Sequence, residues 1–179
     1  MSIGINKLKA IILYFSHNTN KLGKVKLMKL FYYLDFIHLK KYGKPITFDT
    51  YVHLQHGQIP SMIKNIVDEA SDDISSSVLK DTIKIEKVKT ARKLMEKIIP
   101  VREFTKDDEK LFSETELEIL EEISKKFRNS TSDEIEEYSH RESTYKGTKY
   151  LETIPYTLAA RDSDSKVTKE EIELLLKSI

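Results

Sequence analysis

Apolar side chains recur at helical spacing in two stretches near the start of the chain. The first predicts a helix over about residues 4–16, with an apolar face made of Ile5, Leu8, Ile12 and Phe15. The second predicts a helix over about 24–41, with a stripe made of Leu27, Leu30, Phe31, Leu34 and Ile37. We expect the second helix to end at Gly43, with Pro45 just beyond, because glycine commonly closes a helix and proline cannot continue one.

Shorter patterns follow these helices. Residues 50–55 alternate in polarity and predict a short strand, which a turn at 56–60 ends. Ser61 is an expected N-cap for a helix to about residue 70. Residues 71–81 are rich in Ser and Asp and predict a mobile loop. Residues 83–88 and 98–104 suit the two strands of a hairpin, although Pro100 restricts the second to an edge or a bulge.

Three capping boxes then mark helix starts, since a Ser or Thr followed three residues later by Glu satisfies two otherwise unpaired amides. They are Ser113 with Glu116, Thr131 with Glu134, and Thr168 with Glu171. The predicted fold class is therefore mainly α (α+β), a compact helical domain with a small β-hairpin or short sheet. We expect residues 1–155 to form that domain. Residues 156–179 are then a C-terminal extension with one helix, joined through the polar stretch 161–168.

The composition limits the classes of protein to consider. A chain of 179 residues without Cys has no disulfides, no thiolate nucleophile and no Cys-bound metal. No apolar run approaches the ~18 to 20 residues that a membrane span requires, and we find no signal peptide. We therefore expect a cytoplasmic protein with no membrane partner.

Charge is distributed unevenly along the chain. Residues 1–66 contain ten Lys and two Asp, whereas the remainder contains 20 Lys and Arg against 27 Asp and Glu. This pattern is typical either of a basic surface for nucleic acid or of two halves that pack together and neutralise each other. We favour neutralisation, because the basic residues of the first part are all Lys, and Arg is the side chain suited to reading bases.

Catalytic patterns are absent from the sequence: it contains no phosphate-binding loop, dinucleotide fingerprint, zinc-protease motif or nucleophile elbow. His53 and His56 could bind a metal on a helix, but they point opposite ways on a strand, so we predict no metal site. The acidic stretch 134–142 is interpreted as a solvated face. The aromatic residues at 31–36 lie beside Lys26 and Lys29, as in base-stacking surfaces, but their helical spacing favours the core.

The order of several short motifs resembles that of the Panacea domain, the SocA-like antitoxin family, whose members are also found among phage-associated proteins. Residues 26–35 (KLMKLFYYLD) are similar to its "KLxKLxYxxD" opening, and residues 42–52 (YGKPITFDTYV) to its "YGxPITGDTYV". Residues 57–61 (GQIPS) are similar to its "GPVPS" turn, and 111–120 (LFSETELEIL) to its "LSExDxxVL". His140 and Tyr145 fall in a segment similar to its closing "SHxxxxWK". The resemblance covers about residues 5–150.

Three positions depart from the family pattern. Gln58 stands where the family usually has Pro, Phe48 where it has a Gly-like position, and Tyr145 where Trp is usual. Tyr145 keeps an aromatic ring but lacks the indole N–H donor. These departures bear on the choice of partner more than on the fold.

The resemblance implies an antitoxin of a type II toxin–antitoxin system, which neutralises a toxin encoded next door by direct protein contact. It implies no enzymatic activity, cofactor or metal. By family position the partner-binding residues are expected to be Tyr32, Asp35, His56, Gly57, Pro60, His140 and Tyr145. A purely structural role for Tyr32, Asp35 and Tyr145 is an equal alternative. A proteolytic adaptor, which delivers its partner to a protease, and a regulator that binds operator DNA are the other functions consistent with the sequence.

Overall fold

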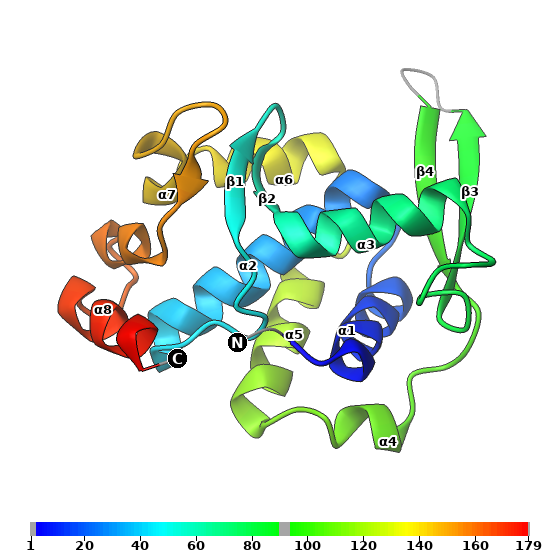
Figure 1. The fold of residues 1–179 in the computed structure, drawn as a ribbon, viewed down its shortest axis with the longest axis horizontal. Helices are drawn as coiled ribbons and strands as arrows, with labels where there is room; N and C mark the ends of the chain where they lie inside the picture. The colour runs from blue at the N-terminus through cyan, green and yellow to red at the C-terminus, as the bar shows by residue number, and fades with distance from the viewer. Residues whose placement is uncertain (1–2, 90–93, 179) are drawn as a thin grey trace.

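Helix α2 (Lys24–Tyr42) is the central element of the molecule, and the other elements pack around it (Figure 1). The computed structural model describes residues 3–89 and 94–178. Every α2 residue from Lys26 to Lys40 is buried, whereas a helix at the surface buries only one stripe. The core therefore surrounds α2 on all sides, and polar residues of this helix lie inside the protein.

The other helices pack on α2 or on each other. Helices α1 (Ile5–Asn18) and α5 (Glu114–Phe127) contact α2 and also contact each other. The remaining helices are α3 (Ser61–Asp72), α4 (Lys106–Glu109), α6 (Ser132–Ser139), α7 (Ser143–Lys146), the 3₁₀ helix η1 (Tyr156–Arg161) and α8 (Lys169–Lys177).

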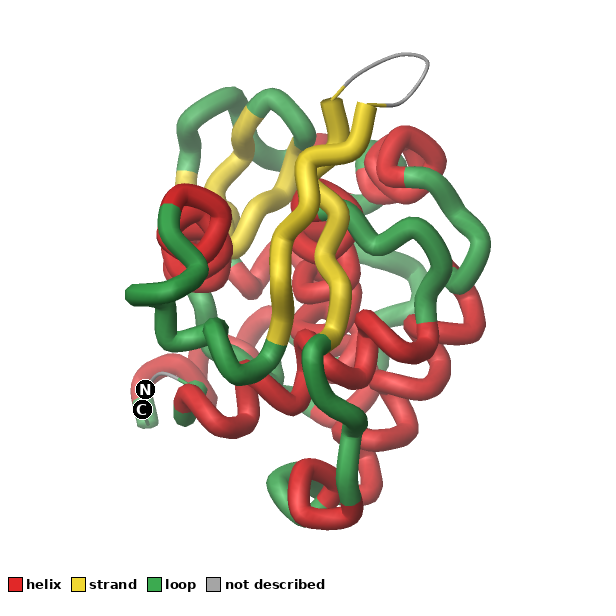
Figure 2. Tube along the Cα trace, turned by 90° about the vertical axis from the view of Figure 1, so that its right-hand side faces the viewer, coloured by secondary structure: helices red, strands yellow, loops and turns green. Residues whose placement is uncertain are grey.

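The strands form two separate antiparallel sheets. One has the order β2-β1-β5 and is built from β1 (Tyr51–Leu54), β2 (Gly57–Pro60) and β5 (Thr153–Ile154). The other is a hairpin of β3 (Ile83–Lys89) and β4 (Leu94–Pro100). Figure 2 shows this hairpin as a long two-stranded ribbon. A bridge between Gly23 and Lys97 joins it to the segment before α2.

The α+β class and the first two helices are confirmed. The hairpin is also confirmed, but its second strand covers 94–100 rather than 98–104. Ile83 pairs with Pro100 at the last position of the ladder, so Pro100 ends the strand instead of interrupting it. Residues 71 and 72 of the predicted loop belong to α3, and residues 73–82 form turns in which Leu79 is fully buried.

The predicted capping signals mark the starts of helices, with one exception. All three predicted capping boxes are confirmed, and a fourth, Thr105 with Asp108, begins α4. The expectation that Ser61 caps α3 is wrong. The carboxylate of Asp49 accepts hydrogen bonds from the backbone amides of Met62 and Ile63, each at 2.9 Å. A residue twelve positions before Ser61 therefore provides the cap, which local spacing does not indicate.

The C-terminal segment packs against the rest of the chain. Leu158 and Ala159 of η1 are buried, and so is Ile172 of α8. The side chain of Lys40 forms ion pairs with Asp162 and Asp164 of the polar stretch. The division into a domain and an extension at residue 155 stays a prediction. None of the helices in the described residues is both long enough and apolar enough to span a membrane.

Candidate partner-binding site

Five polar side chains on α2 recur at intervals of three residues and are all buried. They are Lys26, Lys29, Tyr32, Asp35 and His38. An α-helix turns about 100° per residue, so each step of three places the next side chain about 60° back around the axis. The series therefore winds around α2, and each side chain reaches a different neighbouring segment.

Two members of this series, Lys26 and Asp35, bind loops. Lys26 donates to the backbone oxygens of Asn20 and Ser130, both at 2.8 Å, and burial lowers its pKa to about 8. Asp35 accepts from the amides of Ile46 and Thr47 at 2.8 and 2.7 Å. Burial raises the pKa of Asp35 to about 6, although these donors oppose the shift. Both residues join loops to α2.

Lys29 lies at the centre of a buried polar cluster. Its Nζ donates to Oε1 of Gln58 and to Oγ of Ser139, both at 3.2 Å. The amide nitrogen of Gln58 donates in turn to the backbone oxygen of Ser139 at 3.0 Å and to Oγ1 of Thr144 at 3.1 Å. No carboxylate forms an ion pair with Lys29 among the described residues, and burial lowers its pKa to about 7.

Gly57 lies directly against this cluster. It has a φ of +80°, and a Cβ there would lie 2.8 Å from Nζ of Lys29 and 3.3 Å from Nε2 of His140. A side chain at this position would therefore meet both strain and collision. The absence of a side chain lets Lys29, His140 and the β1–β2 turn meet.

Aromatic rings cover the outer side of the cluster. The ring of His140 stacks on that of Tyr145, with centroids 3.9 Å apart, and His53 contacts the same tyrosine at 4.5 Å. Nε2 of His140 is buried and has no hydrogen-bond partner within the described parts of the chain. Burial lowers the pKa of His140, and the nearby charge of Lys29 acts in the same direction.

His56 is the most accessible of the predicted residues. Its side chain is 46% exposed, at the β1–β2 turn. Its Nδ1 lies 2.9 Å from Oε2 of Glu136 on α6, a distance that allows the ring to donate to the carboxylate. The ring is thus held at the surface in one orientation, next to the Gly57 position.

The structure divides the predicted partner-binding residues into two groups. His56, Gly57, His140 and Tyr145 lie together around the β1–β2 turn and the end of α6. The other three are buried: Tyr32, Asp35 and Pro60. The hydroxyl of Tyr32 bonds Oγ1 of Thr144 at 2.6 Å, so this side chain links α2 to α7.

Sequence reasoning missed the centre of the site. Lys29, Gln58 and Ser139 were not among the expected site residues, yet they connect α2, β2 and α6. The regular interval of three between polar residues in an otherwise apolar helix is the signal that indicates such a network. Gln58, at a position where the family usually has Pro, is fully buried, and both polar atoms of its side chain form hydrogen bonds.

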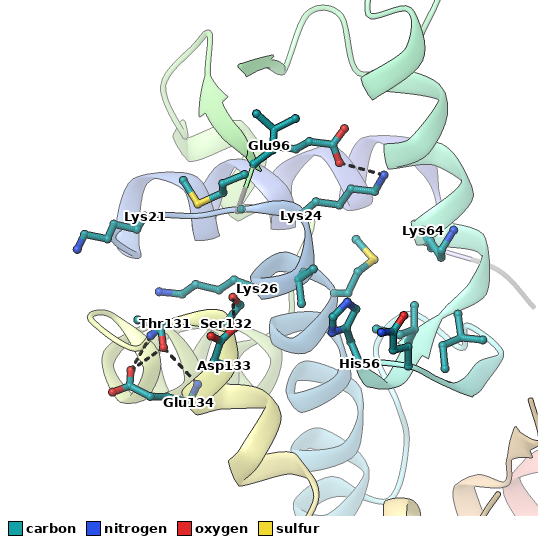
Figure 3. A pocket seen from close by; sticks show the side chains of 18 of the residues that line it. Lys21, Lys24, Lys26, His56, Lys64, Glu96, Thr131, Ser132, Asp133 and Glu134 are labelled. Atoms are coloured by element: carbon teal, nitrogen blue, oxygen red, sulfur yellow. Dashed lines mark hydrogen bonds and ion pairs between the residues drawn. The ribbon is translucent and has the colours of Figure 1, made fainter. Parts of the chain in front are cut away.

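A groove with a volume of about 1270 Å³ opens beside His56. It lies between α6 and the β3–β4 hairpin, and the first turns of α2 form its floor. Figure 3 shows Lys21, Lys24 and Lys64 on one side and the start of α6, with Asp133 and Glu134, on the other. Across residues 3–89 and 94–178, no three His, Asp or Glu side chains are grouped so that they could hold a metal ion.

Comparisons with known proteins give one match. No curated protein and no solved structure matches the chain. The family model described as "Antitoxin SocA-like, Panacea domain" matches residues 27–146. That range contains most of α2, both sheets except β5, and the cluster around Lys29. The chain therefore belongs to the SocA-like antitoxin family and carries a Panacea domain.

Proposed function

We propose that this protein is the antitoxin of a type II system and neutralises a toxin encoded by the adjacent gene through direct contact. The family match carries this proposal. The buried side chains of α2 join segments of the chain, so we assign them a structural role. We propose that Tyr32, Asp35 and Pro60 position the surface indirectly, and that no catalytic step is involved.

The contact surface proposed here centres on the β1–β2 turn. His56 is exposed there, His140 lies against Gly57, and Tyr145 stacks on His140. Tyr150 and Leu151 follow α7 and are 63% and 65% exposed. A histidine held by Glu136 beside exposed apolar side chains provides the mixture of polar and apolar groups typical of protein interfaces. The partner is thus expected to bury this turn.

A co-expression experiment tests the proposal. The adjacent gene is induced with and without this protein, growth is followed, and the two proteins are co-purified. We expect arrest by the neighbour alone, growth with both, and a stable complex. His56→Ala should abolish rescue without changing the melting temperature, because His56 makes one surface hydrogen bond.

His17→Ala is the matched control. His17 is also exposed and bonds the backbone oxygen of Arg102 at 3.0 Å, far along the chain from the proposed surface. Rescue should survive this change. A harmless neighbour, or rescue without a complex, would contradict the neutralisation proposal.

A further inference from the structure

The size of the groove favours a polypeptide occupant. Its volume of about 1270 Å³ exceeds the ~300 to 1,000 Å³ of most small-molecule sites. Its lining comes from the start of α2, the β1–β2 turn, α3, the β3–β4 hairpin, α6 and the turn after α7, and many of these side chains appear in Figure 3. A segment of another protein can fill such a space while remaining connected at both ends.

The groove contains apolar side chains on its floor and at two points of its rim. Met28 and Ile59 lie deep in it, and Met95 comes from β4. Methionine is flexible and polarisable and is common on surfaces that adapt to different partners. Leu94 and Tyr150 line the groove from the hairpin and from the turn after α7, and they are 61% and 63% exposed. Covering both would remove a substantial apolar area from water.

The charged residues of the groove indicate which kind of polypeptide segment it can bind. Lys24 forms ion pairs with Asp68 and Glu96, and Lys64 forms one with Asp68. Lys21 and Lys87 also line the groove, and neither forms a hydrogen bond or a close ion pair among the residues that the structure describes, although Lys87 lies opposite Glu96 in the β3–β4 ladder and its charge acts on that carboxylate. Two lysines are thus available to pair with carboxylates of a partner.

The opposite wall argues against nucleic acid. Asp133, Glu134 and Glu137 line the α6 side, where they would repel a phosphate backbone. No arginine is among the groove residues in the described parts of the chain. A segment with an apolar face and acidic side chains on one flank could pack that face on the floor of the groove. Its carboxylates would then pair with the lysines and lie away from the acidic residues of α6.

We propose that this groove binds an amphipathic, acidic segment of the partner protein, with apolar side chains on Met28 and Met95 and carboxylates toward Lys21 and Lys87. The proposal rests on the proposed function, since the partner is the toxin. It adds a second contact region to the β1–β2 turn, and His56 lies between the two because it lines the groove as well.

Methionine methyl NMR on the full chain tests the groove directly. The probes are a synthetic helical peptide with a leucine face and glutamates elsewhere, the same peptide with lysines in place of glutamates, and a DNA duplex. We expect the glutamate peptide to shift the methyl signals of Met28 and Met95. Met62 lies outside the groove and is the internal reference. Stronger shifts with the lysine peptide or the duplex, or none with any probe, would overturn the proposal.

Two double variants test whether Lys21 and Lys87 contribute to binding of the acidic peptide. Lys21→Asn with Lys87→Thr should weaken binding of the glutamate peptide about tenfold, as expected for the loss of two interfacial ion pairs. Asn suits position 21, where φ is +52°. The control, Lys80→Asn with Lys84→Thr, removes the same charge outside the groove, and Lys84 points to the other face of β3. Equal losses in both variants would contradict the assignment.

The same variants separate this inference from the proposed function. If the groove variant still co-purifies with the toxin and restores growth as the unaltered chain does, the groove proposal is wrong and neutralisation stands. If the neighbour proves harmless while the peptide shifts Met28 and Met95 as expected, the neutralisation proposal fails and the groove remains a binding site for acidic segments.

Discussion

At the scale of single residues, Gly57 is a position where both the backbone conformation and the close neighbours restrict the side chain. We expect Gly57→Ala to lower the free energy of unfolding by about 2 to 4 kcal/mol, because strain at a φ of +80° adds to overpacking against Lys29. Chemical denaturation measures this change. The amide signals of the β1–β2 turn and of the end of α6 should shift most, since these segments meet at Gly57.

Gly4→Ala provides the comparison for Gly57. Gly4 precedes α1 with a φ of −65°, and a Cβ there would meet no heavy atom within 4 Å. Its replacement should lower the free energy of unfolding by less than about 1 kcal/mol, because the only expected effect is that alanine is a weaker N-cap than glycine. Similar losses for the two variants would show that the close approach to Lys29 does not limit position 57.

The residue types of α2 allowed the core to be predicted, but not the roles of its lysines. The aromatic residues at 31–36 are in the core, as their spacing indicates. Lys26 and Lys29 lie beside these aromatic residues in the sequence, as in base-stacking surfaces, yet they are 1% and 0% exposed. Their acceptors lie on loops and on β2 and α6, up to 110 residues away. Periodicity within one helix contains no information about such distant acceptors.

At the scale of elements, a helix or strand can be predicted from the sequence when the interaction that forms it joins residues close together in the chain. The capping boxes are local, and each one begins a helix in the structure. Strand β5 has only two residues, which pair with Tyr51 and Val52 about 100 positions earlier. Asp49 likewise caps α3 only because the fold brings its carboxylate to the start of that helix. Elements that depend on such pairings have no signature in their own sequence.

Helix α8 depends on one buried side chain. Ile172 is its only buried residue among those described, whereas Leu174 is 71% exposed. Ile172→Ala should lower the free energy that holds α8 on the rest of the chain by about 2 to 4 kcal/mol. That loss is enough to detach α8 from η1. Hydrogen exchange should then accelerate at residues 169–178 while the amides of α2 keep their protection, because α8 can open without the core.

Leu174→Ala is the control for α8, and it should leave exchange in the helix nearly unchanged because the side chain is already in water. If Ile172→Ala instead lowers protection in α2 to the same degree, α8 unfolds together with the core. That result would argue against treating residues 156–179 as a separable extension.

At the scale of the whole molecule, the two oppositely charged parts of the chain neutralise each other, as the sequence favours. Lysines from the first 66 residues form ion pairs with acids from the remainder. These pairs are Lys7 with Glu116, Lys9 with Asp81, Lys24 with Glu96, Lys40 with Glu142 and Lys41 with Glu122. Among the lysines of the first part that form no ion pair in the described residues, Lys21 lines the groove and Lys29 lies in the core.

The buried lysines give the whole molecule an unusual dependence on pH. In the unfolded chain Lys29 keeps its proton up to its ordinary pKa of about 10.5, whereas in the folded chain burial lowers that pKa to about 7. Between these values the unfolded state binds more protons, so the free energy of unfolding rises with pH. Lys26, with a pKa of about 8, contributes in the same direction. Below about pH 7 both states are protonated and this gain is absent.

We expect stability to increase from pH 7 toward pH 10, with Lys29 contributing on the order of 3 kcal/mol. Denaturant titrations at successive pH values measure the trend. Lys29→Met should flatten the rise, because it removes the titrating group, even though the cluster loses a donor and the variant is less stable at high pH. Lys21→Met, at an exposed position, should leave the slope unchanged. An unaltered slope in Lys29→Met would mean that Lys29 keeps an ordinary pKa in the folded protein and that water reaches the cluster beneath Gly57.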